Sequence, residues 1–257
     1  MADKLSEKDI DNISIEGTEE HSIMPLRNTV LFPQQVIPIY IGREKSLKLI
    51  SDLELEKRKY IIVVAQEDGS IEDPKPDDLY SYGTLATVLK VFAMPDDSKS
   101  AIVQGIARVK ILEYTEKEPY FKAQVSTISD DLINDELELV GISDNLRKSF
   151  SDLIKVAPNL TEEHTGMLSN IQKPNRLVDR AISLMTLSNQ EKQGILEETN
   201  IKKRIEKAIS IINREIQRIK LGDEIQTEVH DEIAKTQREY YLREQMKAIQ
   251  KELGEDE

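Results

Sequence analysis

The chain has 257 residues and a formal net charge of −13, with 39% hydrophobic and 32% charged residues, which suits one large domain or two smaller ones. The absence of cysteine excludes disulfides, thiolate zinc sites and cysteine nucleophiles, and it agrees with a reducing, cytoplasmic location. No apolar run approaches the roughly 20 residues that span a bilayer, and the acidic balance disfavours nucleic acid as a partner, because phosphate binding depends on Lys and Arg.

Residues 1–21 carry seven acidic residues against two lysines and few apolar side chains. Such a segment buries too little apolar surface to offset the entropy lost on ordering, and it lacks the apolar stretch of a secretory signal. We therefore expect a disordered acidic tail over residues 1–21, with ordered structure beginning near Ser22.

Residues 22–128 have the pattern of β-strands. Pro25 and Pro38 lie in short β-rich runs and cannot donate a backbone hydrogen bond, so their strands should lie at sheet edges or bulges. A helical pattern covers residues 43–57. Further β-rich runs cover residues 60–65, 83–93, 100–114 and 120–128. This order predicts a strongly bent sheet or small barrel with one helix packed on it.

Residues 129–222 change to the period of helices and are expected to form a helical bundle. An apolar stripe from Leu137 to Ile154 predicts the first helix, and Gly222 is expected to end the last one. Signals for helix starts lie between them at Thr161, at Pro174, and at Ser188 or Asn189.

The segment 201–220 contains seven Lys or Arg and two acidic residues. Such a basic segment can contact an acidic partner or nucleic acid. A solvated helix face, or one that pairs with the acidic helix that follows, is the more common arrangement and the one we favour.

Residues 223–257 are expected to form a long connecting helix. Leu242, Met246, Ile249 and Leu253 recur at spacings of four, three and four, which places them on one helical face. No proline interrupts residues 223–253, and at about 1.5 Å per residue this helix would be roughly 45 Å long. It is too long for a small domain to cover, so we expect it to project toward a further part of the protein.

Three blocks of the sequence resemble the Lon proteases. QREYYLREQMKAIQKELGE at residues 237–255 resembles the segment that joins the amino-terminal region of these proteases to their AAA+ ATPase module. PLRNTVLFPQQVIPIYIGREKSLKLI at residues 25–50 resembles the opening of their substrate-recognition domain. KPNRLVDRAISLMTLSNQEKQGILEETNIKKRIEKAISIINREI at residues 173–216 follows the order of motifs in the family.

The resemblance implies an α+β fold, in which a small PUA-like β domain precedes an all-α bundle that ends in a long helix. It implies a substrate-recognition and assembly region of an ATP-dependent serine protease that degrades misfolded and regulatory proteins. The partners would be unfolded polypeptides and other copies of the chain, in a homohexamer. Alternatives are a stand-alone protein-binding module, or an RNA-binding module of the PUA-like type, which the acidic balance opposes.

We expect no catalytic, cofactor-binding or metal site in this chain. No glycine is followed by lysine, so the phosphate-binding loop that would hold ATP and Mg²⁺ in the parent protein is absent here. Ser46 with Lys48, and Ser98 with Lys99, lie in polar surroundings that do not suit a Ser-Lys dyad. The three histidines are too scattered in the sequence for a metal-ligand motif.

Apolar side chains in the β domain are the candidates for contact with unfolded clients, because a receptor for many sequences needs adaptable apolar surface. Met94 precedes a turn and is expected near the surface, whereas Ile37 is expected in the core. The full set of candidates is Phe32, Pro33, Tyr40, Phe92 and Met94, with ordinary core packing as the alternative interpretation.

A second group of candidates lies on the long helix. These side chains either seal the helical bundle or contact a neighbouring subunit or a client, since a helix of this length cannot bury every face in its own domain. They are Tyr240, Tyr241, Leu242, Met246 and Ile249.

Overall fold

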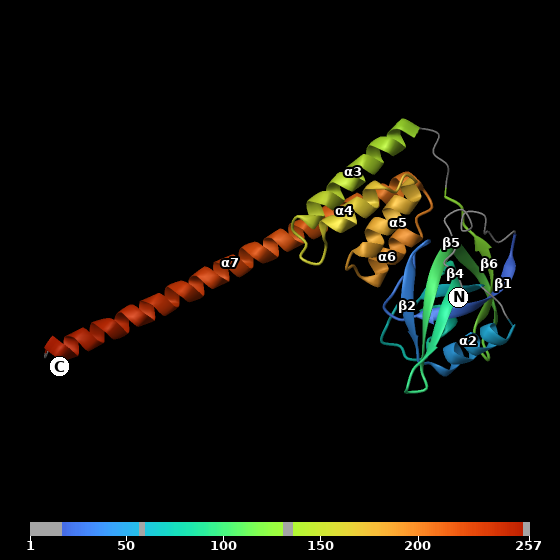
Figure 1. Cartoon of the computed structure of the whole chain (residues 1–257), viewed down its shortest axis with the longest axis horizontal. Helices are drawn as coiled ribbons and strands as arrows, with labels where there is room; N and C mark the ends of the chain where they lie inside the picture. The colour runs from blue at the N-terminus through green and yellow to red at the C-terminus, as the bar shows by residue number, and fades with distance from the viewer. Residues whose placement is uncertain (1–16, 57–59, 131–135, 254–257) are drawn as a thin grey trace.

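The computed structural model of the chain describes residues 17–56, 60–130 and 136–253 (Figure 1). A β domain and a helical bundle lie side by side, and one helix leaves the bundle as an isolated rod that ends near the C-terminus. The fold is therefore α+β, with the strands first and most of the helices after them, as the sequence pattern predicts.

The β domain is a mixed sheet whose strands follow the spatial order β2-β5-β4-β3-β1-β6. An additional β5–β6 pairing closes five of the strands into a barrel and leaves β2 on its outside. β1 and β3 are parallel, and the other neighbours are antiparallel. The strands are β1 (Glu19–Leu26), β2 (Val36–Ile41), β3 (Tyr60–Ala65), β4 (Tyr82–Ala93), β5 (Lys99–Glu116) and β6 (Lys122–Thr127).

Pro25 and Pro38 each lie where their strand has no neighbouring strand on one side. Pro38 is in β2, which pairs with β5 alone. Pro25 is opposite Val64 of β3, but β1 pairs with β6 only over Glu19 to Ser22, so Pro25 lies beyond that pairing. The prediction that these strands have free edges is confirmed.

β1 begins at Glu19, earlier than expected. Glu19, Glu20 and His21 pair with β6, so the expectation that residues 19–21 belong to a disordered tail is wrong. Their backbone groups complete a ladder with β6, an interaction between distant segments that composition does not reveal. Residues 1–16 of the predicted tail lie outside the described residues.

Helix α2 (Glu44–Glu56) covers one end of the barrel and packs into one of its two apolar clusters. Leu49, Ile50 and Leu53 lie on its inner face beside Ile61 of β3. The spacing of these leucine and isoleucine positions is that of an amphipathic helix, which is why this segment packs on the sheet as the sequence pattern predicts.

The helical bundle follows β6. Its members are α3 (Glu136–Ile154), α4 (Glu162–Ser169), α5 (Pro174–Leu184), α6 (Asn189–Leu196) and the first part of α7 (Ile201–Leu253). The predicted starts at Thr161, Pro174 and Ser188 are confirmed as N-cap or first helical residues. In α3, Leu137 and Val140 are exposed, so only the later part of the predicted apolar stripe is buried.

Gly222 does not end a helix, which corrects the prediction at this position. α7 is continuous over 53 residues, about 80 Å at 1.5 Å per residue. One glycine inside a helix costs about 1 kcal/mol relative to alanine, which strong helix formers on both sides offset. The boundary at residue 222 is instead a change of environment, because residues 221–252 are exposed.

Within the part of the chain that the structure describes, no helix is both long and apolar enough to cross a bilayer.

Candidate functional site

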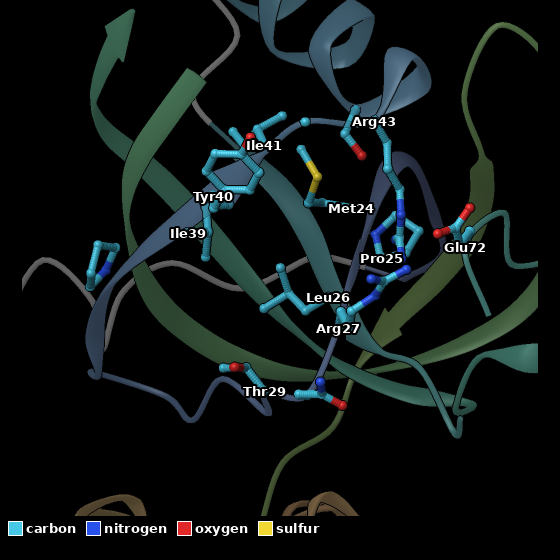
Figure 2. A pocket seen from close by; sticks show the side chains of 14 residues that line it. Met24, Pro25, Leu26, Arg27, Thr29, Ile39, Tyr40, Ile41, Arg43 and Glu72 are labelled. Atoms are coloured by element: carbon cyan, nitrogen blue, oxygen red, sulfur yellow. The ribbon is translucent and has the colours of Figure 1, made fainter. Parts of the chain in front are cut away.

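A groove of about 670 Å³ opens on the β domain between β1 and β2 (Figure 2). Its walls come from the end of β1 and the loop that follows it, from β2, from the start of α2, and from Glu72. The lining residues are Met24, Pro25, Leu26, Arg27, Asn28, Thr29, Pro38, Ile39, Tyr40, Ile41, Gly42, Arg43, Ser46 and Glu72.

The floor of the groove is apolar. Met24 and Leu26 of β1, together with Ile39 and Ile41 of β2, belong to the buried cluster under α2. Successive side chains of a strand point to opposite faces, so Met24 and Leu26 share one face of β1, and Ile39 and Ile41 share one face of β2. The alternation in both strands therefore produces an apolar surface between them, and such a surface can contact apolar ligand side chains of different shapes.

The backbone on both sides of the groove has free edges. β2 pairs with β5 on one side only, and Met24 to Leu26 pair with β3 but lie beyond the β6 ladder. The backbone C=O groups along such an edge, and the N–H groups of its residues other than Pro25 and Pro38, can bind an additional extended chain. The groove thus combines strand edges with an apolar floor, an arrangement that suits an extended polypeptide.

Tyr40 forms the exposed rim of the groove. Its side chain is 68% exposed, and its hydroxyl donates to Asp96 Oδ2 over 3.2 Å, which connects β2 to the β4–β5 turn. Asp96 also accepts from Ser98, and this hydrogen bond is the main reason that its pKa lies below the ordinary aspartate value. The ring is therefore held in place while most of its surface remains open.

Phe92 and Met94 lie near Tyr40. Tyr40 is opposite Ser100 of β5, and Ser100 is opposite Phe92 of β4. The side chains of Tyr40, Ser100 and Phe92 therefore form one row across the outer face of the sheet. Lys90 Nζ lies 4.6 Å from the centre of the Phe92 ring. Phe92 and Met94 are 38% and 42% exposed. The structure brings together three of the predicted binding residues, and Met94 is at the surface as predicted.

Phe32 is in the interior instead. Its side chain is 1% exposed and packs in the cluster of the helical bundle, so the alternative interpretation as core applies to it. The loop that carries it is tied to the sheet by hydrogen bonds from Gln34 N to Gly105 O, 2.8 Å, and from Gly105 N to Gln35 O, 2.9 Å. A side chain at Gly105 would meet Phe32 O at 2.3 Å, so glycine is required for this approach.

Pro33, the residue after Phe32, lines a second groove of about 660 Å³ between the β domain and helices α4 and α5. Pro33 is partly buried there and is separate from the groove that contains Tyr40. Ile37 is also partly buried and packs against the cluster under α2, as expected of a core residue.

The candidates on α7 lie far from both grooves, on the rod (Figure 1). All of them are more than half exposed, so the interpretation that they seal the bundle is wrong, because the bundle ends before the helix reaches them. Contact with another subunit or a client remains a prediction for Tyr240, Tyr241, Leu242, Met246 and Ile249.

Two arginines that the sequence reasoning missed stand at one end of the first groove. Nη2 of Arg27 and Nη2 of Arg43 both approach the carbonyl oxygen of Ile71, at 3.3 and 3.5 Å, and Arg43 also donates to Gln66 Oε1 at 2.5 Å. Partial burial and, after it, the charge of Arg27 lower the pKa of Arg43 from its ordinary value. Arg27 and Arg43 are 16 positions apart in the sequence, so no local sequence pattern indicates that their side chains meet.

The described residues contain no group of three or more His, Cys, Asp or Glu that could hold a metal ion. Lys48 Nζ pairs with Asp52 over 2.8 Å, and Lys99 Nζ pairs with Glu54 over 3.0 Å. The lysines of the two Ser-Lys combinations in the sequence therefore each contact a carboxylate.

Comparison with known proteins places the chain in a family. A family model described as the ATP-dependent protease La (LON) substrate-binding domain matches residues 20–214. The Lon protease of Dictyoglomus thermophilum is 41% identical over 233 residues, and that of Koribacter versatilis is 41% identical over 236. Each alignment covers 91% of this chain and 29% of the relative, so the chain spans less than a third of these proteins.

Solved structures support the fold. The N-terminal domain of Mycobacterium avium complex Lon protease superposes with a TM-score of 0.60 at 18% identity, covering 76% of this chain and 98% of that one. The Lon N-terminal domain protein from Xanthomonas campestris gives a TM-score of 0.52 at 16% identity, covering 75% and 98%. The family match, the relatives and the shared fold agree: the chain belongs to the family of Lon protease substrate-binding domains.

Proposed function

We propose that this chain is the substrate-recognition and assembly region of an ATP-dependent, Lon-like serine protease that degrades misfolded and regulatory proteins. In this proposal the chain itself binds unfolded polypeptide and performs no catalysis. ATP, Mg²⁺ and the Ser-Lys dyad belong to the other modules of the parent protein, which acts in the cytoplasm as a homohexamer, with protein clients and not nucleic acid as its partners.

The observation that carries the proposal is the groove between β1 and β2. An extended peptide can bind at a free strand edge through backbone hydrogen bonds, which are independent of its side chains. Met24, Leu26, Ile39 and Ile41 then accept apolar side chains of varied shape. Tyr40 and the neighbouring Phe92 and Met94 extend this apolar surface beyond the groove.

A site-specific crosslinking experiment tests this function. A photoreactive amino acid replaces Tyr40 in one variant and Leu55 in another, because both side chains are exposed, at 68% and 80%, and only Tyr40 lines the groove. A chemically unfolded, fluorescent client protein is then added and the samples are irradiated. We expect strong client labelling from position 40 and weak labelling from position 55. Equal labelling from both, or none from position 40, would contradict the proposal.

A further inference from the structure

Arg27 and Arg43 form a cationic pair at the groove (Figure 2). The Arg43 side chain runs from the start of α2 past Pro25 toward Arg27, and both guanidinium groups reach the carbonyl oxygen of Ile71. Two like charges that share one neutral acceptor retain donors for an anion, since each guanidinium has five N–H groups. The pair is thus an electrostatic feature of the groove as well as part of its wall.

Among residues 17–56, 60–130 and 136–253, no carboxylate lies within ion-pair distance of either guanidinium. Glu72 and Asp73 act on Arg43 only through longer-range attraction, which raises its pKa less than burial and Arg27 lower it. A carboxylate that reached both arginines would relieve their mutual repulsion and form charge-assisted hydrogen bonds.

The position of the pair relative to the floor specifies the kind of carboxylate. Met24 and Leu26 are buried in the apolar cluster under α2, whereas Pro25 between them and Arg27 after them lie on the other face. A peptide added along this edge also alternates, with every second side chain over the apolar floor. The peptide side chains at the intervening positions lie on the face of Pro25 and the two arginines.

We propose that the groove selects extended segments in which an acidic side chain stands between two apolar ones, with its carboxylate bound by Arg27 and Arg43. This inference rests on the proposed function, and it specifies which unfolded segments are preferred. A free C-terminal carboxylate has the same chemistry, but only an internal aspartate or glutamate leaves apolar residues on both sides for the floor.

The test measures fluorescence anisotropy of labelled ten-residue peptides with the whole chain. The first peptide alternates valine or leucine with serine, has one central glutamate in a serine position, and is amidated at its C-terminus. The second has glutamine in place of the glutamate. The third is the glutamine peptide with a free C-terminus. We expect the glutamate peptide to bind about tenfold more tightly than the other two, the effect expected of a charge-assisted hydrogen bond.

Variants assign the preference to the pair. Arg27→Gln combined with Arg43→Gln should reduce the ratio between the glutamate and glutamine peptides to about one. Arg43 also donates a hydrogen bond to the buried Gln66, which the double variant removes. The single variant Arg27→Gln changes an exposed position and leaves this hydrogen bond in place. It should lose part of the preference. Glu72→Gln should increase the preference, since it removes a repelling charge at the groove.

The outcomes separate this inference from the proposed function. Equal binding of the glutamate and glutamine peptides by the unaltered chain would overturn the selection of an acidic residue and leave polypeptide binding intact. Preference for the free C-terminus, or an undiminished ratio in the double variant, would also overturn it. Failure of every peptide to bind would overturn both.

Discussion

Arg108 of β5 and Asp179 of α5 form a buried ion pair across the boundary between the β domain and the helical bundle, with side chains only 5% and 4% exposed. Arg108 Nε also donates to the carbonyl oxygen of Leu196 at the end of α6, over 3.0 Å. Arg204 of α7 lies 4.0 Å from the same carboxylate. The two halves of the molecule are therefore joined by a polar network as well as by apolar packing.

Removal of one member of this pair should destabilise the fold strongly. Asp179→Ala leaves the Arg108 charge buried without its carboxylate, and such a change typically costs about 3–5 kcal/mol. Chemical denaturation followed by circular dichroism measures it. Asp152→Ala is the control, since Asp152 pairs with Lys155 on the surface, where solvent screens the pair, and its loss should be much smaller. Similar losses in the two variants would refute a structural role for the pair.

Asp130 should make stability depend on pH in the acid range. Burial alone would raise the pKa of Asp130, but the charges of Arg204 and Arg108 and hydrogen bonds from Arg204 and Asn175 outweigh it and hold the pKa below the ordinary value. A carboxyl with a lower pKa in the folded state contributes stability above its unfolded pKa, about 3.9 for aspartate. This contribution disappears as the pH falls through the folded-state pKa.

The check on Asp130 is the free energy of unfolding from pH 7 to pH 2. Asp130→Asn should be less stable than the unaltered chain at pH 7 and should approach it in the acid range. Asp231→Asn, on the exposed part of α7, is the control and should follow the unaltered chain throughout. A constant difference between Asp130→Asn and the unaltered chain across the range would show that the carboxylate charge is not the cause.

The two phenylalanines predicted for client binding should respond differently to the same substitution. Phe32→Ala removes a ring that is 1% exposed, and we expect a loss of about 3–5 kcal/mol in the free energy of unfolding. Phe92→Ala removes a ring that is 38% exposed and should cost much less, while it weakens binding of an unfolded client if the proposed function is correct. Thermal melts and client titrations separate the two effects. Equal destabilisation would contradict the assignment of Phe32 alone to the core.

Ser188 should stabilise the start of α6. Its Oγ accepts from the Glu191 N–H at 3.3 Å, and Glu191 Oε2 accepts from the Ser188 N–H at 3.0 Å. Ser188→Ala should cost about 1 kcal/mol, the usual effect of losing an N-cap side chain. Ser169→Ala, at a serine that bonds back to Thr165 O within α4, should stay within about 0.5 kcal/mol. The cap assignment fails if urea denaturation finds the two variants equally stable.

Identical substitutions at two positions of α7 test whether the rod contributes to the fold. Ile205 is fully buried in the bundle, so Ile205→Ala should lower the free energy of unfolding by about 2–5 kcal/mol. Ile249 is 58% exposed on the rod, so Ile249→Ala should change it by less than about 0.5 kcal/mol. Guanidinium titrations of dilute samples provide the comparison. A large loss at Ile249 would mean that the rod packs against something in solution.

Local patterns in the sequence were sufficient to predict the order of the strands and helices. Pro174 and Ser188 indicate helix starts because a missing N–H or a capping hydroxyl acts within one turn. The helical pattern of residues 43–57 predicts α2 for the same local reason. The motifs of residues 25–50 and 237–255 indicate the family, but they do not show where the side chains lie in the fold.

Contacts between distant segments were decided only by the tertiary structure. The burial of Phe32 depends on helices that come more than a hundred residues later, and the hydrogen bond from Arg108 to Asp179 joins positions 71 residues apart. The continuity of α7 through Gly222 depended on the sum of propensities around it, which a single residue does not reveal. The groove and its arginine pair exist because strand pairing leaves two edges open side by side, a property of the closed sheet and of no single segment.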